Sequence, residues 1–317
     1  MKAVTVHQYG PPSQLGLGEL PIPRPGPGQI QVRIAAASIN PLDLRLPRGD
    51  FPQLPVTFPH VPGNDFAGTV TAVGEGVTGF RIGDEVFGHA VPAALGPLAG
   101  AKRPSITTGT LAEFAVFEAD TPMIAHRPAD LDVVQAAALP TVGLTALALI
   151  ATAKVRPGET VLVVGATGGV GTTVLPLLAR AGARVIATAR PADEELLREL
   201  GADEIIGYGE YPAGVDVALN LVLPSDELNE VAHALAPGGR LYTITFPMPR
   251  PDFIDRDDVT FELVLDVDGT IAGMREVAAA GLTAVIARRY PFAQAGQAIA
   301  DFAERHTVGK LVVLIES

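Results

Sequence analysis

The chain has 317 residues, about the length of two domains, and 48% of them are apolar, which is enough for a large core and too many for a disordered chain. It carries 23 Lys and Arg against 35 Asp and Glu, a net charge of −12, and it contains no cysteine. These values argue against a nucleic-acid partner and exclude disulfides, thiolate metal sites and cysteine nucleophiles. Because the chain opens on Met1-Lys2 and a short alternating segment, we expect a cytoplasmic protein.

The first part of the chain consists of short alternating segments separated by proline. Twelve of the 28 prolines fall within the first 64 residues. The segments with period-two alternation are 2–7, 29–34, 66–73 and 109–117. This alternation, broken by Gly and Pro, predicts an irregular antiparallel barrel or sandwich.

Residues 133–153 form a stretch of 21 residues without a charge, which is long enough to span a bilayer. Pro140, Gly143 and several threonines interrupt it, and alanine, which gains little from lipid, dominates its composition. We interpret it as a pair of buried helices broken at Leu139-Pro140, and we expect no membrane partner.

After about residue 124, continuous apolar strands alternate with helices. The predicted strands are 160–164, 184–188, 204–207, 215–222, 240–245 and 260–267, and the predicted helices are 170–181, 191–200 and 225–235. This alternation predicts a parallel sheet with right-handed crossovers. The tail has a strand over 283–287, a helix over 292–305 and a strand over 310–315, and we expect it to return to the first domain. The predicted domains are therefore 1–123 with 281–317, and 124–280.

The strongest chemical signal is a glycine-rich turn between the strand 160–164 and the helix after it. It has the spacing Ala166-x-Gly168-x-x-Gly171, in which the turn is tight and backbone N–H groups approach a pyrophosphate. We predict that six consecutive residues contact a dinucleotide: Ala166, Thr167, Gly168, Gly169, Val170 and Gly171. The alternative is a tight strand-to-helix turn without a ligand.

The next strand ends at Thr188-Ala189-Arg190, where a site for NAD usually places an acidic residue for the ribose 2′-OH. Arg190 can instead bind a 2′-phosphate with two hydrogen bonds, so Thr188 and Arg190 predict NADPH as the cofactor. The alternative is a solvated arginine in front of a helix.

With these residues in place, the chain resembles the medium-chain dehydrogenase/reductase superfamily, and within it the zinc-independent, quinone-oxidoreductase-like branch. The segments that carry the resemblance are 40–43, 62–70, 73–77, 80–86, 109–114, 136–147, the glycine turn, 200–203 and 237–240. The resemblance implies an α/β protein with a GroES-like β-barrel domain and a Rossmann domain, a doubly wound parallel sheet. It also implies a homodimer formed through the edge strand 260–267.

The resemblance also shows where this chain departs from zinc-dependent members. Those carry Cys where this chain has Asn40, and Gly-His-Glu where it has Gly63-Asn64-Asp65. The six histidines show no metal-ligand spacing, so we expect no metal. Without a Lewis acid, the expected reaction is hydride transfer from NADPH to a small electron-poor acceptor, a quinone or an enone.

Three residues of the first domain are the predicted catalytic residues. By resemblance Asn40 would bind the substrate carbonyl or the nicotinamide ribose, although Asn40 before Pro41 is also typical of a helix cap. Asp43 is either a cap or an orienting group. Asp65 is either functional or a structural carboxylate paired with Arg45 or Arg48.

Five further residues are predicted to contact the cofactor: Thr145, Asn220, Thr245, Phe246 and Lys310. Thr145 could instead bond its own helix backbone, and Lys310 could be a solvated charge on an edge strand. Asn220 begins the segment Asn-Leu-Val-Leu-Pro, where many relatives have Asp-Thr-Val-Gly or similar, so the pocket wall there is expected to differ.

No tyrosine stands out as a proton donor, so the final proton is expected from water. His126 and His233 are interpreted as packing or surface residues, and the acidic loop 252–258 as solvated, with a carboxylate metal site as the weaker alternative. Two other functions stay open: an NADPH-binding structural or sensor protein with little turnover, and an alcohol dehydrogenase with an unusual metal site.

Overall fold

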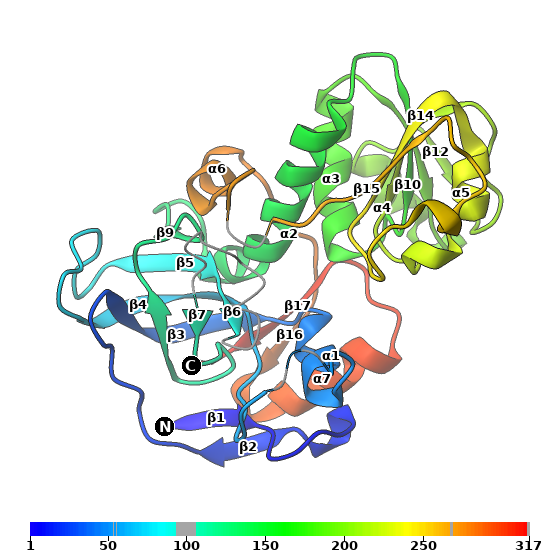
Figure 1. Cartoon of the computed structure of the whole chain (residues 1–317). Helices are drawn as coiled ribbons and strands as arrows, with labels where there is room; N and C mark the ends of the chain where they lie inside the picture. The colour runs from blue at the N-terminus through cyan, green and yellow to red at the C-terminus, as the bar shows by residue number, and fades with distance from the viewer. Residues whose placement is uncertain (53, 55, 93–105, 267–268, 316–317) are drawn as a thin grey trace. The chain divides into compact units, whose positions relative to one another are not determined.

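The computed structural model describes residues 1–52, 54, 56–92, 106–266 and 269–315. The chain divides into two compact units (Figure 1). The first, here the N-terminal unit, contains Met1–Leu144 and Val267–Ser317, and the second, the nucleotide unit, contains Thr145–Asp266. The C-terminal segment therefore packs with the N-terminal one.

The N-terminal unit is built on a largely antiparallel sheet, in the order β6-β7-β8-β3-β4-β5-β9, with β17 paired to β3 and β16 paired to β17. Its strands are β1 (Lys2–Thr5), β2 (Gly16–Glu19), β3 (Gln29–Ser38), β4 (Asp65–Val73), β5 (Glu85–His89), β6 (Val91–Pro92), β7 (Ile106–Thr107), β8 (Phe114–Glu118), β9 (Ile124–His126), β16 (Ile286–Pro291) and β17 (Lys310–Leu314). Strands β1 and β2 form a separate antiparallel pair. The expected β-rich first domain is confirmed, with its strands starting and ending within a few residues of several predicted segments.

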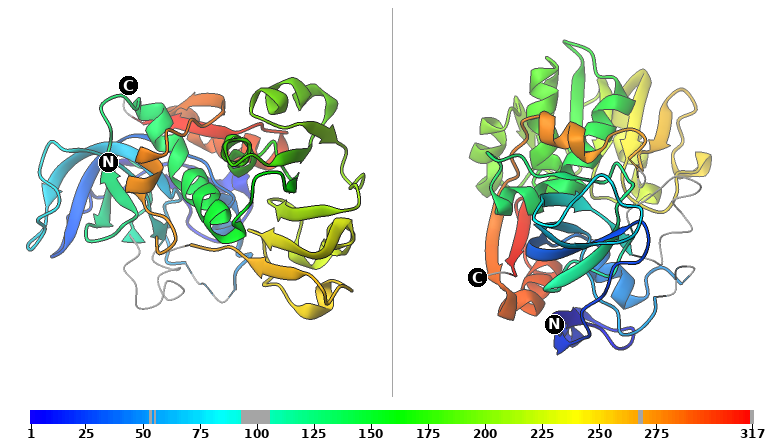
Figure 2. Two further views of the ribbon diagram at one scale, coloured as in Figure 1. Left: turned by 90° about the horizontal axis from the view of Figure 1, so that it is seen from above. Right: turned by 90° about the vertical axis from the view of Figure 1, so that its left-hand side faces the viewer.

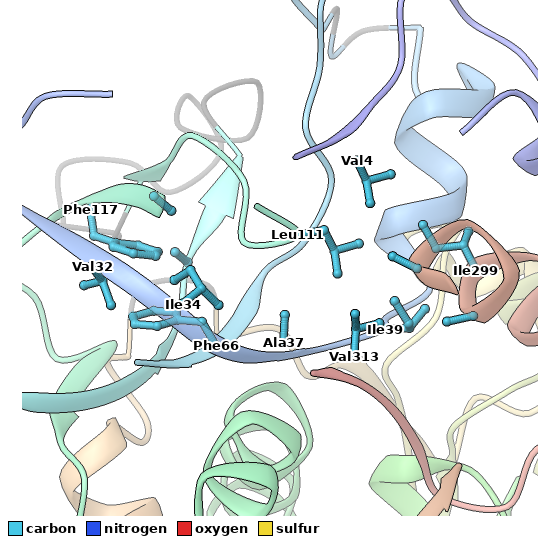
Figure 3. Close-up of a cluster of buried hydrophobic side chains, with 14 of the residues drawn as sticks. Val4, Val32, Ile34, Ala37, Ile39, Phe66, Leu111, Phe117, Ile299 and Val313 are labelled. Carbon is cyan, nitrogen blue, oxygen red and sulfur yellow. The ribbon is translucent and has the colours of Figure 1, made fainter. Parts of the chain in front are cut away.

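The helices of this unit are α1 (Leu42–Arg48), α6 (Met274–Ala279) and α7 (Ala295–Glu304). Its core extends along the sheet (Figure 3). At one end Phe66 and Phe117 stack with ring centroids 4.0 Å apart, and the other end reaches α7. Ile299 of α7 lies close to Ile39 and belongs to the same core. Period-two alternation on β3 sends Ile30, Val32 and Ile34 into this core, as the sequence predicts.

Helix α2 (Val133–Ala153) begins in the N-terminal unit and continues into the nucleotide unit. The prediction of two helices broken at Leu139-Pro140 is wrong, because α2 is one helix with Pro140 inside it. Asp132 caps its start by accepting hydrogen bonds from the backbone of Val134 and Gln135. By length and composition α2 could cross a membrane, but 67% of its apolar window is buried within the protein, as in a core helix. That burial outweighs the roughly 3 kcal/mol local cost of the proline.

The nucleotide unit is a parallel sheet in the order β12-β11-β10-β13-β14-β15. Its strands are β10 (Thr160–Val164), β11 (Arg184–Thr188), β12 (Glu204–Ile206), β13 (Val215–Asn220), β14 (Leu235–Thr243) and β15 (Thr260–Leu263), and its helices are α3 (Gly169–Arg180), α4 (Glu194–Glu199) and α5 (Asn229–Ala234). Numbered by their place in the sequence, the strands run 3-2-1-4-5-6, the order of dinucleotide-binding sheets. The Rossmann prediction is confirmed.

Figure 2 shows the strands and helices of this unit in green to orange. Alternate residues of its central strands face opposite sides of the sheet. Val163 packs with Leu149 of α2 and Leu175 of α3 on one face. Leu162 packs with Val231 of α5 on the other face. Both faces are covered, which explains why these strands are almost entirely apolar.

The two units divide at different places from the predicted domain boundaries. The segments 124–144 and 267–280 were predicted in the Rossmann domain, whereas they pack with the N-terminal unit. Helix α6 explains the second difference, because the backbone N–H of Met274 donates to Pro122 O. Thr141 of α2 explains the first, since it donates two hydrogen bonds to Asp65 of β4.

Candidate functional site

The glycine turn lies between β10 and α3, and each of its glycines has a different environment. Gly165 has a φ of +90°, which favours glycine, and its N–H donates to Thr188 Oγ1 at 2.9 Å. A Cβ on Gly171 would lie 2.4 Å from the Ala166 carbonyl oxygen, so only glycine allows α3 to pack there. Gly168 differs, because it has an ordinary φ of −68° and a Cβ would meet only the Gly165 carbonyl oxygen, at 3.5 Å.

Gly168 therefore has no need to be glycine for the sake of the fold. A residue without a side chain at the start of α3 leaves space in front of the first-turn N–H groups, where a pyrophosphate binds in this kind of turn. Residues 166–171 thus fit a dinucleotide, and Thr188 supports the turn through its hydroxyl rather than facing solvent, being fully buried.

The end of β11 fits a phosphorylated ribose. Arg190 follows the strand by two residues, is exposed, and has no ion-pair partner in the described part of the chain. No carboxylate stands between Thr188 and Arg190 to bind a 2′-OH. An exposed guanidinium at this place could bind a phosphate group with two hydrogen bonds.

The ends of β13 and β14 are tied together by a hydroxyl and amide network. Asn220 is fully buried, and its Nδ2 donates to Leu223 O, Thr243 Oγ1 and Thr245 Oγ1 at 2.7–3.0 Å. Ser225 adds a 2.7 Å bond to the carbonyl oxygen of Thr245. The side chains of Asn220 and Thr245 therefore shape this rim of the sheet, and sequence reasoning missed Ser225 and Thr243 as their partners.

Two other predicted cofactor residues lie near the same sheet. Thr245 and Phe246 follow β14 rather than ending it, because the strand stops at Thr243. Both are partly exposed, as is Thr145 of α2.

A second polar site lies in the N-terminal unit, buried at the ends of several strands. We call it the Asp65 cluster, and its members are Ser38, Asn40, Asp43, Asp65, His89, Thr141 and Lys310. The pairing of β3, β4 and β5 aligns Ser38 with Asp65 and Asp65 with His89, so these three residues form one row across the sheet. Sheet register, which the sequence does not reveal, brings them together.

The Oδ2 atom of Asp65 accepts three hydrogen bonds. The donors are Asn40 Nδ2 at 2.9 Å, Ser38 Oγ at 3.1 Å and Lys310 Nζ at 3.4 Å. Asp65 is completely buried and Lys310 is only 4% exposed. The prediction that Asp65 pairs with Arg45 or Arg48 is wrong, because both arginines pair with Asp50.

The Oδ1 atom of Asp65 has hydrogen-bond partners on two further elements, α2 and β5. Thr141 of α2 donates through its backbone N–H at 3.1 Å and through its hydroxyl at 2.6 Å. His89 Nδ1 lies 3.1 Å away. Burial alone raises the pKa of Asp65, but the Lys310 ammonium and the hydrogen bonds from His89 and Thr141 outweigh it and set the pKa at about 2.

Lys310 begins β17, which lies between β16 and β3 and is not an edge strand. Its ammonium donates to Asn40 Oδ1 at 2.6 Å and to the Ile39 carbonyl oxygen at 3.0 Å, in addition to Asp65. Burial lowers the pKa of Lys310, while Asp65 and Asp43 raise it. The interpretation of Lys310 as a solvated charge is wrong, and all three of its N–H groups are used inside the N-terminal unit.

Asn40 does not cap α1 with its side chain, because the helix starts after Pro41 and both polar atoms of the Asn40 amide bond Lys310 and Asp65. Asp43 reaches back instead. It accepts hydrogen bonds from the backbone N–H groups of Asn40, at 2.8 Å, and Gly63, at 2.7 Å. Burial raises the pKa of Asp43 to about 7, although these two N–H groups lower it.

Four of the seven members were among the residues predicted from the sequence: Asn40, Asp43, Asp65 and Lys310. The sequence analysis missed Ser38, His89 and Thr141. A motif search gives no signal for these three, since they lie at strand ends and inside a helix. His89 is the last residue of β5, and its alignment with Asp65 becomes visible only once the strands are paired.

The other polar groups named from the sequence are surface features. His126 bonds Asp84, and His233 bonds Asp255, with both imidazoles more than half exposed. In the acidic loop, Arg256 pairs with Asp258. Among the residues that the structure describes, no group of three or more His, Cys, Asp or Glu is arranged to hold a metal ion.

Two family models match this chain, one in its first half and one in its second. Residues 26–127 match the alcohol dehydrogenase GroES-like domain, and residues 200–313 match the family described as zinc-binding dehydrogenase. The Arabidopsis thaliana chloroplast envelope quinone oxidoreductase homolog is 30% identical over 93% of this chain and 92% of its own. The quinone oxidoreductase of Sus scrofa is 30% identical over 99% of this chain and 98% of its own. The chloroplastic NADPH-dependent alkenal/one oxidoreductase of Arabidopsis thaliana is 29% identical over 88% of this chain and 70% of its own.

Solved structures of similar fold cover almost the whole chain. The quinone oxidoreductase of Coxiella burnetii has a TM-score of 0.84 at 27% identity, covering 100% of this chain and 99% of its own. A thermostable alcohol dehydrogenase from Pyrobaculum aerophilum has a TM-score of 0.83 at 28% identity, covering 99% of each. A mycobacterial protein solved in complex with NADPH has a TM-score of 0.81 at 27% identity, covering 99% and 100%.

The GroES-like and Rossmann architecture, the glycine turn and relatives at 30% identity over nearly the full length agree with one another. The chain is a member of the medium-chain dehydrogenase/reductase superfamily of oxidoreductases, in the group of quinone oxidoreductase homologues.

Proposed function

We propose that this protein is a zinc-independent oxidoreductase that uses NADPH to reduce a quinone or an α,β-unsaturated carbonyl compound. The observation that carries the proposal is the bonding of Lys310. Its ammonium already occupies Asn40 Oδ1 and Asp65 Oδ2, the oxygens that a cation at this place would need. An acceptor that is electron-poor by itself requires no metal to accept hydride.

The choice of NADPH rests on the nucleotide unit. The glycine turn fits a pyrophosphate, and Arg190 is an exposed cation without an ion-pair partner among the described residues, at the place expected for a 2′-phosphate. When bound, the nicotinamide supplies a hydride, and the residues of this chain hold the cofactor and orient the acceptor. The Arabidopsis thaliana relative named as an NADPH-dependent alkenal/one oxidoreductase and the mycobacterial protein solved with NADPH support this choice.

The first experiment is a panel of acceptors. NADPH oxidation is followed at 340 nm with 1,4-benzoquinone, methyl vinyl ketone and an aldehyde, and we expect turnover with the first two. Absence of turnover with every acceptor, in a sample that binds NADPH, would overturn the proposal in favour of a binding or sensor protein.

The second experiment tests cofactor choice with Arg190→Ala. A charge-assisted bidentate contact contributes about 1.5–3 kcal/mol, so the ratio of NADPH to NADH efficiency is expected to fall by about 10- to 100-fold. Arg198→Ala is the matched control, because Arg198 is an exposed arginine in the same unit that pairs with Glu194. A ratio that is unchanged in Arg190→Ala contradicts the assignment of NADPH.

A further inference from the structure

His89 belongs to the Asp65 cluster and has no role in the reaction as proposed above. Its Nδ1 lies 3.1 Å from Asp65 Oδ1 and 3.0 Å from Thr141 Oγ1, and its side chain is 15% exposed. Its other ring nitrogen, Nε2, has no hydrogen-bond partner among the described residues and is not among the fully buried unsatisfied atoms. Hydrogen bonds therefore hold Nδ1, whereas Nε2 is left without a hydrogen-bond partner among these residues.

The hydrogen bonds around Nδ1 decide its protonation. Thr141 has a single hydroxyl hydrogen, and the 2.6 Å contact assigns it to Asp65 Oδ1. The Thr141 oxygen can therefore only accept from Nδ1, and the carboxylate can also only accept, because the pKa of Asp65 is about 2. Nδ1 must carry a hydrogen, so Nε2 is the atom that gains or loses the exchangeable proton.

We propose that His89 is the proton donor of the reductase, with Nε2–H as the acid and Asp65 and Thr141 as the groups that orient the ring. This inference rests on the proposed function, and it replaces the expectation that the final proton comes from water. A buried carboxylate that accepts a hydrogen bond from Nδ1 fixes the orientation of the ring, as an aspartate does beside a catalytic histidine.

With an enone as acceptor, electrons and protons balance within the turnover. The β-carbon of the acceptor gains a hydride, NADPH is oxidised to NADP⁺, and the acceptor becomes an enolate. The Nε2–H bond breaks as the enolate oxygen takes the proton, and the enol then rearranges to the ketone. The neutral imidazole recovers a proton from water before the next turnover.

The charged and titratable groups around His89 come from several elements. Asp65 of β4 contacts the ring directly, and Thr141 of α2 contacts it without titrating. Lys310 of β17 acts through Asp65. Asp43 of α1 also belongs to the cluster and has a pKa of about 7, so the test includes a variant without this carboxyl group.

The test compares His89→Gln with His126→Gln. His126 is also a histidine of the N-terminal unit hydrogen-bonded to an aspartate, Asp84, but it is 57% exposed. With methyl vinyl ketone, His89→Gln is expected to lower kcat by at least about 100-fold, within the usual range for general acid catalysis. NADPH binding, measured by fluorescence, should stay within about twofold of wild type, and His126→Gln should match wild type throughout.

A second readout distinguishes proton donation from a structural role. The loss in His89→Gln should be smaller with 1,4-benzoquinone, because a hydroquinone anion is a weaker base than an enolate and needs a proton donor less. The kcat of wild type with methyl vinyl ketone should fall as the pH rises, because a general acid must carry its proton to act. This limb should persist in Asp43→Asn and disappear in His89→Gln, and free imidazole should restore activity to His89→Ala.

The outcomes separate the two proposals. Activity of His89→Gln within threefold of wild type, or an unchanged pH limb, overturns the role of His89 and leaves the proposed function standing. A wild-type protein that turns over no acceptor overturns the proposed function itself. If His89→Gln does not fold, the wild-type profile decides, since a kcat without a falling limb between about pH 5 and 9 overturns the role of His89.

Discussion

The Lys310–Asp65 pair gives the most direct test of how the N-terminal unit is held together. Lys310→Met removes the ammonium but keeps most of the side-chain volume, and it leaves the Asp65 carboxylate buried. At 3.4 Å and an effective dielectric constant of about 20, the Coulomb attraction that is lost is about 5 kcal/mol. Breaking one side of a buried pair usually costs about 3–5 kcal/mol, and we expect a loss of unfolding free energy in that range at pH 7.

The loss of unfolding free energy in Lys310→Met should depend on pH, because the Asp65 carboxylate titrates. In wild type the pKa of Asp65 is about 2, below its unfolded value of 3.8, so the carboxylate contributes stability above pH 4 that is lost as the pH falls through 2. Lys310 contributes to the low folded pKa of Asp65, so its removal is expected to raise that pKa. The cost of Lys310→Met should therefore be largest near pH 7 and shrink toward pH 4.

The assay is urea unfolding followed by circular dichroism and by hydrogen exchange of peptides from β3, β4 and β17. Exchange is needed because the chain has no tryptophan and its two units can unfold separately. Arg81→Met is the control, since Arg81 is 90% exposed and pairs with Asp84 at 3.3 Å, for an expected effect of at most about 1 kcal/mol. The double variant Lys310→Met with Asp65→Asn should recover part of the loss. Equal effects of Lys310→Met and Arg81→Met would refute the reasoning.

Three further predictions concern the rest of the structure. Asp43 has a pKa of about 7 in the folded state against 3.8 in the unfolded state, so the unfolding free energy of wild type should fall by up to about 4 kcal/mol as the pH rises from 4 to 7. The urea midpoints of Asp43→Asn should lose this dependence on pH. An unchanged dependence in the variant would contradict the raised pKa of Asp43. Gly168→Ala should keep the wild-type Tm but bind NADPH at least about 10-fold more weakly. Gly171→Ala should lose about 1–3 kcal/mol of unfolding free energy, because its Cβ would lie 2.4 Å from the Ala166 carbonyl oxygen. Equal Tm values for the two variants would contradict this difference in packing. Strand β15 is the edge of its sheet, where two copies of the chain could pair as a dimer. In that case Phe261→Lys should convert the dimer to a monomer, as measured by light scattering. A monomeric wild type would rule this interface out.

The nucleotide unit is predictable from sequence to a large extent. Strand β10, the glycine turn, α3 and β11 are local features, each set by the apolar pattern and glycine spacing of neighbouring residues. Their order could therefore be predicted, with the bounds of both strands matching and those of α3 differing by one residue. The role of Gly171 follows in the same way, since a strand-turn-helix unit brings Gly171 against Ala166 within six residues of chain. The absence of cysteine likewise excludes thiolate metal chemistry by composition alone.

The Asp65 cluster, by contrast, depends on how remote segments pack. Its members come from β3, α1, β4, β5, α2 and β17, and Lys310 lies 245 residues from Asp65 along the chain. Strand register and burial turn a lysine that looked like a solvated charge into a buried ion pair, and they place a histidine without any motif beside the same carboxylate. The physical reason is that hydrogen bonding and pKa depend on distance and desolvation, which pairing between remote segments sets and local sequence patterns do not.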